Sequence, residues 1–296
     1  MKALIFGSNG YIGRHLSFLL KNNSINFSCC DVDKESADNH NNYKQIDIRE
    51  ISQIKKIDLN VDYIFLFSGL TGTKASFLNY SDFIDINEKG LLNLLECIKD
   101  RKKPPRIIFP STRLVYKGSR FPLKETSASE AKTIYANNKV ACENYLKLYS
   151  EYYHVPYTVF RICVPYGNLL NENYSYGTIG FFISQAQKNK QISIYGKGEQ
   201  KRTFTHVFDV VALIWETLKY SKSKNEIFNI GGENYGLRDI AELIAKKYQA
   251  KIIFSDWPEF DLKLESGSTF FDASKIEQLT SYKYRYNIQD WINKYL

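Results

Sequence analysis

The sequence predicts an α/β protein built on a doubly wound parallel sheet, with a smaller C-terminal lobe. Two observations predict this fold. The first 165 residues alternate short β-branched or aromatic runs with longer segments of helical period. A glycine-rich turn, GSNGYIG at 7–13, stands between the first of these runs and the first helical segment. Alternation of this kind is typical of a parallel sheet whose loops beyond the carboxyl ends of the strands bind ligands.

Six runs are typical of strands, and they lie at 2–7, 26–31, 43–47, 63–68, 106–110 and 157–163. The segments between them carry apolar stripes at helical spacing. The stripes are formed by Ile12, Leu16, Leu19 and Leu20, then by Leu91, Leu94, Leu95 and Ile98, and then by Val140, Tyr145 and Leu148. We therefore expect residues 1–165 to form a dinucleotide-binding domain of the Rossmann type.

After about Tyr166 this rhythm loosens into loops rich in Gly, Asn and Tyr. We expect residues 166–296 to form mainly a substrate-binding lobe. A helix is predicted over 206–220 and a buried strand over 227–230. The chain is therefore expected to return to the sheet at about 203–231.

Composition excludes several classes of protein. The 40 Lys and Arg residues exceed the 32 Asp and Glu residues by 8, and 44% of the 296 residues are hydrophobic, which excludes a disordered chain. The lysines are scattered, which argues against a nucleic-acid partner. No apolar run reaches the roughly 18 residues of a membrane span. The five cysteines form no CxxC pair. We expect reduced thiols, no metal site, no membrane insertion and a cytoplasmic protein.

The glycine turn predicts a site for a dinucleotide. Glycines allow a tight turn and let the backbone approach a diphosphate, while the helix N-terminus offers N–H groups to the phosphates. The second strand ends at Asp31, whose carboxylate can accept hydrogen bonds from a ribose diol. It would repel a 2′-phosphate, so NAD is favoured over NADP. Asp31 could instead be a solvated loop acid, and Asp33 could share its task.

Two further strand ends are candidates for cofactor contacts. Asp47, after the third strand, could accept a hydrogen bond from the adenine amino group, or could be a solvated turn acid. Ser68 and Gly69 follow the fourth strand, where a residue without a side chain suits backbone that passes a cofactor, or simply a turn.

A catalytic pair is predicted at the start of a helix. Tyr135 and Lys139 stand four residues apart and therefore share one helical face. An ammonium beside a phenol stabilises the phenolate and lowers its pKa toward the range of an acid–base catalyst. Ser111 and Thr112 directly follow the fifth strand, where a hydroxyl can bind the same substrate oxygen.

These pieces resemble the extended short-chain dehydrogenases/reductases of the nucleotide-sugar, NAD-dependent epimerase/dehydratase family. The resemblance spans nearly the whole chain. It rests on GSNGYIG at 7–13, Asp31, Asn87 within DINEKGLLNLLE, PSTRLVY at 110–116, YANNK at 135–139, RICVPYG at 161–167, IYGKGEQKRTFTHVFDV at 194–210, FNIGGEN at 228–234 and DASK at 272–275.

The resemblance implies roles for individual residues. Thr112, Tyr135 and Lys139 would be catalytic, with Tyr135 as the acid–base and Lys139 holding the nicotinamide ribose. Arg202 would bind the substrate diphosphate. The cofactor-binding residues implied are Gly7, Asn9, Gly10, Tyr11, Ile12, Asp31, Asp47, Ile48, Ser68, Gly69, Asn87 and Lys139. In relatives the helices that match 87–99 and 135–149 form the interface of a homodimer, which we expect here too.

The sequence departs from the family pattern in three places. Dehydratases of the family carry Asp-Glu after the catalytic Thr, and here Arg113 and Leu114 stand there, which argues against a 4,6-dehydratase. Many members have Asn where this chain has Val164. The basic residue often found before the DASK segment has Lys263 as its nearest candidate, so Lys263 is a further expected substrate contact.

Three functions are compatible with these motifs. The first is a 4-epimerase that oxidises C4 of a nucleotide-diphosphate hexose transiently with NAD. The second is a reductase that uses NADH or NADPH to reduce a nucleotide-bound 4-keto-6-deoxy sugar once. The third is a non-catalytic dinucleotide sensor, which would not need Thr112, Tyr135 and Lys139 together. We favour the 4-epimerase because Asp31 favours NAD.

Overall fold

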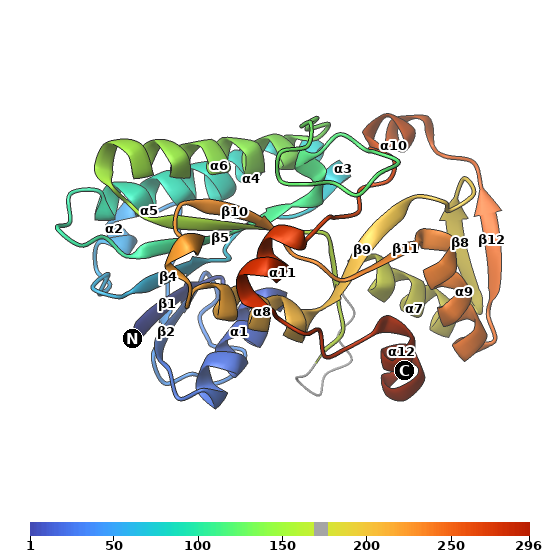
Figure 1. Cartoon of the computed structure of the whole chain (residues 1–296), viewed down its shortest axis with the longest axis horizontal. Helices are drawn as coiled ribbons and strands as arrows, with labels where there is room; N and C mark the ends of the chain where they lie inside the picture. The colour runs from blue at the N-terminus through green and yellow to red at the C-terminus, as the bar shows by residue number, and fades with distance from the viewer. Residues whose placement is uncertain (169–176) are drawn as a thin grey trace. The chain divides into compact units, whose positions relative to one another are not determined.

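A seven-stranded sheet forms the centre of the first of two units in this computed structural model, which describes residues 1–168 and 177–296 (Figure 1). The first unit comprises residues 1–115, 131–161 and 218–228. The second comprises residues 116–130, 162–217 and 229–296. The sequence of the first unit supplies the alternation of strands and helices, and it holds the predicted dinucleotide and catalytic residues.

The strand order in this sheet is β10-β6-β5-β4-β1-β2-β3. The strands are β1 (Lys2–Phe6), β2 (Asn26–Asp31), β3 (Tyr43–Gln45), β4 (Tyr63–Leu66), β5 (Arg106–Thr112), β6 (Tyr157–Ile162) and β10 (Glu226–Asn229). The central strand β1 pairs in parallel with both β2 and β4. The doubly wound arrangement therefore brings the ends of β1, β2, β4 and β5 to one edge of the sheet.

Helices cover both faces of this sheet. In Figure 1, α5 (Gly90–Ile98) and α6 (Ile134–Tyr153) lie on one face and α1 (Tyr11–Asn22) on the other. Shorter helices, α2 (Ile51–Ile54), α3 (Thr73–Leu78) and α4 (Tyr80–Ile84), occupy the connections. The apolar stripe of α5 supplies Leu91, Leu94, Leu95 and Ile98 to the core against β1, β4 and β5.

Several predicted elements differ from the observed ones, two of them next to predicted cofactor-binding residues. The third strand ends at Gln45, two residues earlier than predicted, because the Asp47 N–H donates to the Gln53 side chain and the Asp47 carboxylate accepts from the Arg49 N–H. These bonds turn the chain. The helix predicted over 87–99 begins as a π-helical turn, η1 (Asp85–Lys89), before α5. Such turns are frequently found at functional sites.

The second unit contains two smaller sheets. One has the order β11-β9-β7, formed by β7 (Val164–Tyr166), β9 (Lys201–His206) and β11 (Glu233–Gly236). The other pairs β8 (Gln191–Tyr195) with β12 (Lys251–Ser255). The helices are α7 (Gly177–Asn189), α8 (Val207–Thr217), α9 (Leu237–Tyr248), α10 (Glu259–Leu264), α11 (Ser274–Thr280) and α12 (Ile288–Tyr295). Within the described ranges, none of the helices combines the length and apolarity that crossing a membrane requires.

Candidate active site

The glycine turn packs too tightly for side chains at two of its positions. Gly7 has a φ of +79°, and a Cβ atom there would overlap the backbone of Ser68 after β4. A Cβ atom at Gly13 would overlap the carbonyl oxygen of Gly7. No side chain caps α1, which begins at Tyr11, so the positive end of its dipole faces the turn. The turn fits a dinucleotide diphosphate.

Asp31 lies at the end of β2 and is held by two backbone donors. One carboxylate oxygen accepts from the Asn9 N–H at 2.8 Å and the other from the Val32 N–H at 2.8 Å. Burial raises the pKa of Asp31 above its ordinary value, while the two N–H donors lower it. Each oxygen keeps a lone pair, so this carboxylate has the acceptors that a ribose diol requires.

The Asn9 side chain is occupied by the loop after β2. Its amide nitrogen donates to Asp33 Oδ2 at 3.0 Å and to the Glu35 carbonyl at 2.9 Å, and its Oδ1 accepts from the Ala37 N–H. In this arrangement the side chain of Asn9 orders the loop, and a cofactor contact at Asn9 would come from its backbone.

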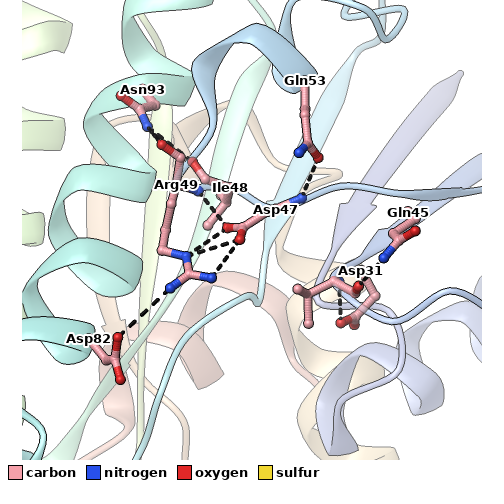
Figure 2. Close-up of polar contacts among 9 residues, drawn as sticks. Asp31, Gln45, Asp47, Ile48, Arg49, Gln53, Asp82 and Asn93 are labelled. Carbon is pink, nitrogen blue, oxygen red and sulfur yellow. Dashed lines mark hydrogen bonds and ion pairs between the residues drawn. The ribbon is translucent and has the colours of Figure 1, made fainter.

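Asp47 is engaged by Arg49, as Figure 2 shows. The Arg49 guanidinium binds both carboxylate oxygens, at 2.6 Å for the closest contact, and lowers the pKa of Asp47. The neighbouring Ile48 side chain is buried against Gly90 of α5. A cavity of about 730 Å³ lies beside Asp47 and is lined also by Val32 and Ile46.

The turn after β4 meets the π-helical turn at Gly69. A Cβ atom at Gly69 would stand 3.0 Å from Asn87 Oδ1 and 4.0 Å from Lys139 Nζ. The Asn87 amide accepts from the Leu70 N–H at 2.8 Å and donates to the Leu70 carbonyl at 3.1 Å. Asn87 thereby holds the backbone that passes Lys139.

The predicted catalytic residues all lie in the first unit. Thr112 is the last residue of β5, and Tyr135 is the second residue of α6, whose N-terminus is capped by the Thr133 hydroxyl. Thr112, Tyr135 and Lys139 are each more than nine-tenths buried. The Tyr135 ring packs edge-on against Phe83.

The charged side chain of Lys139 is almost completely buried. Its Nζ lies 4.5 Å from the centre of the Phe109 ring and 5.8 Å from that of Tyr135. Burial lowers the pKa of Lys139 to about 8. A lysine with a pKa near neutral pH can exchange protons with a neighbouring tyrosine under physiological conditions. When the lysine is charged, it stabilises the phenolate form of that tyrosine.

Three residues next to the catalytic candidates were not predicted from the sequence. Phe109 faces the lysine from β5, Cys142 donates its thiol hydrogen bond to the Asn87 carbonyl at 3.1 Å, and Glu143 binds Ser111. None belongs to a sequence motif. Glu143 carried one signal, since it stands four residues after Lys139 on the same face of the helix.

The two predicted substrate residues of the second unit differ sharply. Arg202 on β9 is 2% exposed, and its guanidinium donates to Glu265 Oε1 at 2.7 Å and to the carbonyls of Lys201 and Gly267. Lys263 on α10 is exposed and forms an ion pair with Glu259 one turn earlier. Arg202 is therefore a buried cation held by protein oxygens, whereas Lys263 is a surface residue.

The chain is similar to a known protein family and to individual members of known function. The family model described as "NAD dependent epimerase/dehydratase family" matches residues 3–231. A UDP-glucuronate 4-epimerase of Thermodesulfobacterium geofontis is 28% identical over 261 residues, which cover 85% of this chain and 77% of that protein.

Solved structures share the fold over almost the entire chain. The UDP-glucose 4-epimerase of Thermotoga maritima, solved with UDP-glucose, has a TM-score of 0.86 at 23% identity and covers 99% of this chain and 96% of its own. That of Thermus thermophilus, solved with NAD, has a TM-score of 0.84 at 19% identity and covers 100% of both chains. With the family model matching residues 3–231, this chain belongs to the NAD-dependent epimerase/dehydratase family of nucleotide-sugar enzymes.

Proposed function

We propose that this chain is an NAD-dependent nucleotide-sugar 4-epimerase. The observation that carries the proposal is the grouping in the first unit of a buried lysine, a tyrosine one helical turn before it and the Thr112 strand end. The epimerase relative and the two epimerase structures support the same reaction. The substrate class that they suggest is a UDP-hexose or UDP-hexuronate.

The first unit fits NAD better than NADP. The glycine turn has no room for side chains at Gly7 and Gly13, and the Asp31 carboxylate presents acceptors to a ribose diol while repelling a 2′-phosphate. We assign the adenine to the cavity beside Asp47. When bound, NAD supplies a hydride acceptor that can also give the hydride back.

The residues of the chain supply the acid–base chemistry. Tyr135, supported as phenolate by the Lys139 ammonium, removes the proton of the C4 hydroxyl, while the Thr112 hydroxyl binds the same oxygen. Once the sugar presents its other face, Tyr135 returns the proton. We assign the substrate diphosphate to Arg202, which would exchange Glu265 for phosphate oxygens. Lys263 is left out of the proposed site.

Redox stoichiometry tests this proposal against the reductase. The purified protein should interconvert UDP-glucose and UDP-galactose, or the matching uronates, with only catalytic NAD, and anomeric proton NMR would follow the two epimers. The nicotinamide absorbance band should show no net change. Stoichiometric consumption of NADH or NADPH with a 4-keto-6-deoxy nucleotide sugar, and no epimer from a 4-hydroxy sugar, would replace the epimerase by the ketoreductase.

A further inference from the structure

A buried ion-pair network lies behind the Thr112 strand end. The Glu143 carboxylate on α6 accepts from the Ser111 hydroxyl on β5 at 2.5 Å. The Arg161 guanidinium on β6 donates to the same carboxylate, from Nη2 to Oε2 at 2.6 Å and from Nε to Oε1 at 3.0 Å. Three elements of the first unit therefore meet at one side chain.

The network is poorly accessible to water. The side chains of Glu143 and Arg161 are only 7% and 12% exposed, and Ser111 is buried. The desolvation of such a pair offsets much of its attraction, so stability alone is a weak reason for it. A bidentate ion pair does, however, fix the relative positions of its two side chains.

The sequence places both ends of this network next to catalytic candidates. Ser111 directly precedes Thr112 at the end of β5. Glu143 follows Lys139 by one helical turn, and Lys139 follows Tyr135 by one turn. A single carboxylate thus connects the strand that ends in Thr112 with the helix that carries the tyrosine and the lysine.

We propose that Glu143 is a positioning residue that, through Ser111 and Arg161, holds Thr112 in register with Tyr135 and Lys139. The proposal rests on the acid–base roles given to these three residues under the proposed function. Glu143 touches neither substrate nor cofactor in this scheme. It sets the separation of the groups that do, and small errors in such separations cost large factors in rate.

Glu143 also acts electrostatically on Lys139. Burial lowers the pKa of Lys139 to about 8, whereas Cys142 and Glu143 on the same helix raise it. The Lys139 ammonium also lies near the Phe109 ring of β5, near Gly69 after β4 and near the Tyr135 ring on its own helix, and of these groups only the phenol titrates. Loss of the Glu143 charge should therefore lower the pKa of Lys139 further.

The first test is Glu143→Gln in the full-length protein with NAD. We expect kcat to fall about tenfold or more, with the KM for the nucleotide sugar changed less than about twofold. The loss of activity at alkaline pH, which follows deprotonation of Lys139, should move to lower pH. Ser111→Ala keeps the carboxylate charge, so it should lower kcat without moving the pH profile.

Ser223→Ala is the matched control. Ser223 is a buried serine that accepts from Arg106 at the opposite end of β5, so its loss also removes one buried hydrogen bond from this strand. It should leave kcat unchanged. A kcat for Ser223→Ala as low as that of Ser111→Ala would mean that any loosening of β5 lowers the rate, and would overturn the positioning role.

A double variant separates positioning from folding. Glu143→Leu combined with Arg161→Met removes both charges of the pair together and should fold. A positioning role predicts that kcat stays low in the folded double variant, whereas recovery of wild-type kcat would overturn it.

A substrate-free measurement keeps the test independent of the reaction. NMR titration of the Lys139 side chain, assigned with Lys139→Arg, should give a lower pKa in Glu143→Gln than in the wild type. An unchanged pKa would contradict the inference. If the wild-type protein failed to epimerise any sugar, the proposed function would fail by itself, and this titration would still decide whether Glu143 acts on Lys139.

Discussion

At the residue scale, Tyr135 combines a proton-transfer role with a packing role that can be separated. Tyr135→Phe keeps the ring and its edge contact with Phe83 and removes only the phenol oxygen. We expect turnover to fall about 10²-fold or more, the usual size of an acid–base contribution, with NAD affinity nearly intact. Steady-state kinetics and calorimetry with NAD check this. Near-normal turnover would remove Tyr135 from the mechanism.

Asp31 is the residue at which cofactor choice can be measured. Asp31→Ala removes the acceptors for a ribose diol and the repulsion of a 2′-phosphate, so the preference for NAD over NADP should narrow. Asp31 also holds the Asn9 and Val32 N–H groups, so both affinities should weaken. The ratio of the two dissociation constants is therefore the relevant measurement. Equal affinities in the unmodified protein would contradict the assignment.

Arg202 is expected to affect both binding and stability. Its guanidinium is buried and ion-paired with Glu265, so Arg202→Ala removes a buried ion pair and should also lower stability. We expect nucleotide-sugar binding to weaken by about 1.5 to 3 kcal/mol, the range for hydrogen bonds to charged groups, while NAD binding is spared. Calorimetry with each ligand at a temperature where the variant is folded provides the check. Equal weakening of both ligands would make Arg202 purely structural.

At the element scale, Gly13 illustrates how closely α1 approaches β1. A Cβ atom at Gly13 would overlap the Gly7 carbonyl oxygen, whereas one at Gly10 would stand 3.3 Å from the same atom. We expect Gly13→Ala to cost about 3 kcal/mol of unfolding free energy or more and to abolish NAD binding. Gly10→Ala, the matched control, should cost far less. Thermal unfolding with and without NAD measures both. Similar losses for the two variants would refute the close approach.

The elements that sequence could predict are those set by local pattern. The spacing of apolar residues gave the α5 stripe, and the run of β-branched and aromatic residues gave β1 and β5. The π-helical start of α5 could not be predicted, because it depends on contacts with α6. There Cys142 binds the Asn87 carbonyl, and Asn138 and Tyr145 bind Glu88.

Only part of the candidate site could be predicted from the sequence. The Tyr135–Lys139 pair is local, since both residues lie on one helix, and the spacing alone places them on one face. The partners of Glu143 lie on β5 and β6, 32 and 18 residues away, so no local pattern connects them. The contact of the Asn9 side chain with Asp33, in the loop after β2, also joins distant residues and could not be predicted either. Contacts between distant segments need the fold.

At the scale of the whole molecule, burial of the Lys139 ammonium lowers the stability of the folded state, and other interactions in the fold must offset this loss. Its pKa is lowered from 10.5 to about 8 by burial, so the charged form is disfavoured in the folded state. At a pH below 8, Lys139 is protonated in both the folded and the unfolded state. The full free-energy cost of burying its charge is then present. Between pH 8 and 10.5 the unfolded chain binds more protons, so the contribution of this group to stability rises with pH.

Lys139→Met keeps most of the length of the side chain and removes the charge, so it should be more stable than the wild type by roughly 3 kcal/mol at neutral pH. The advantage should shrink as the pH rises from 8 toward 10.5. Denaturant unfolding of both proteins over this range measures it. A difference in stability that stayed constant between pH 8 and 10.5 would show that the pKa of Lys139 is not lowered.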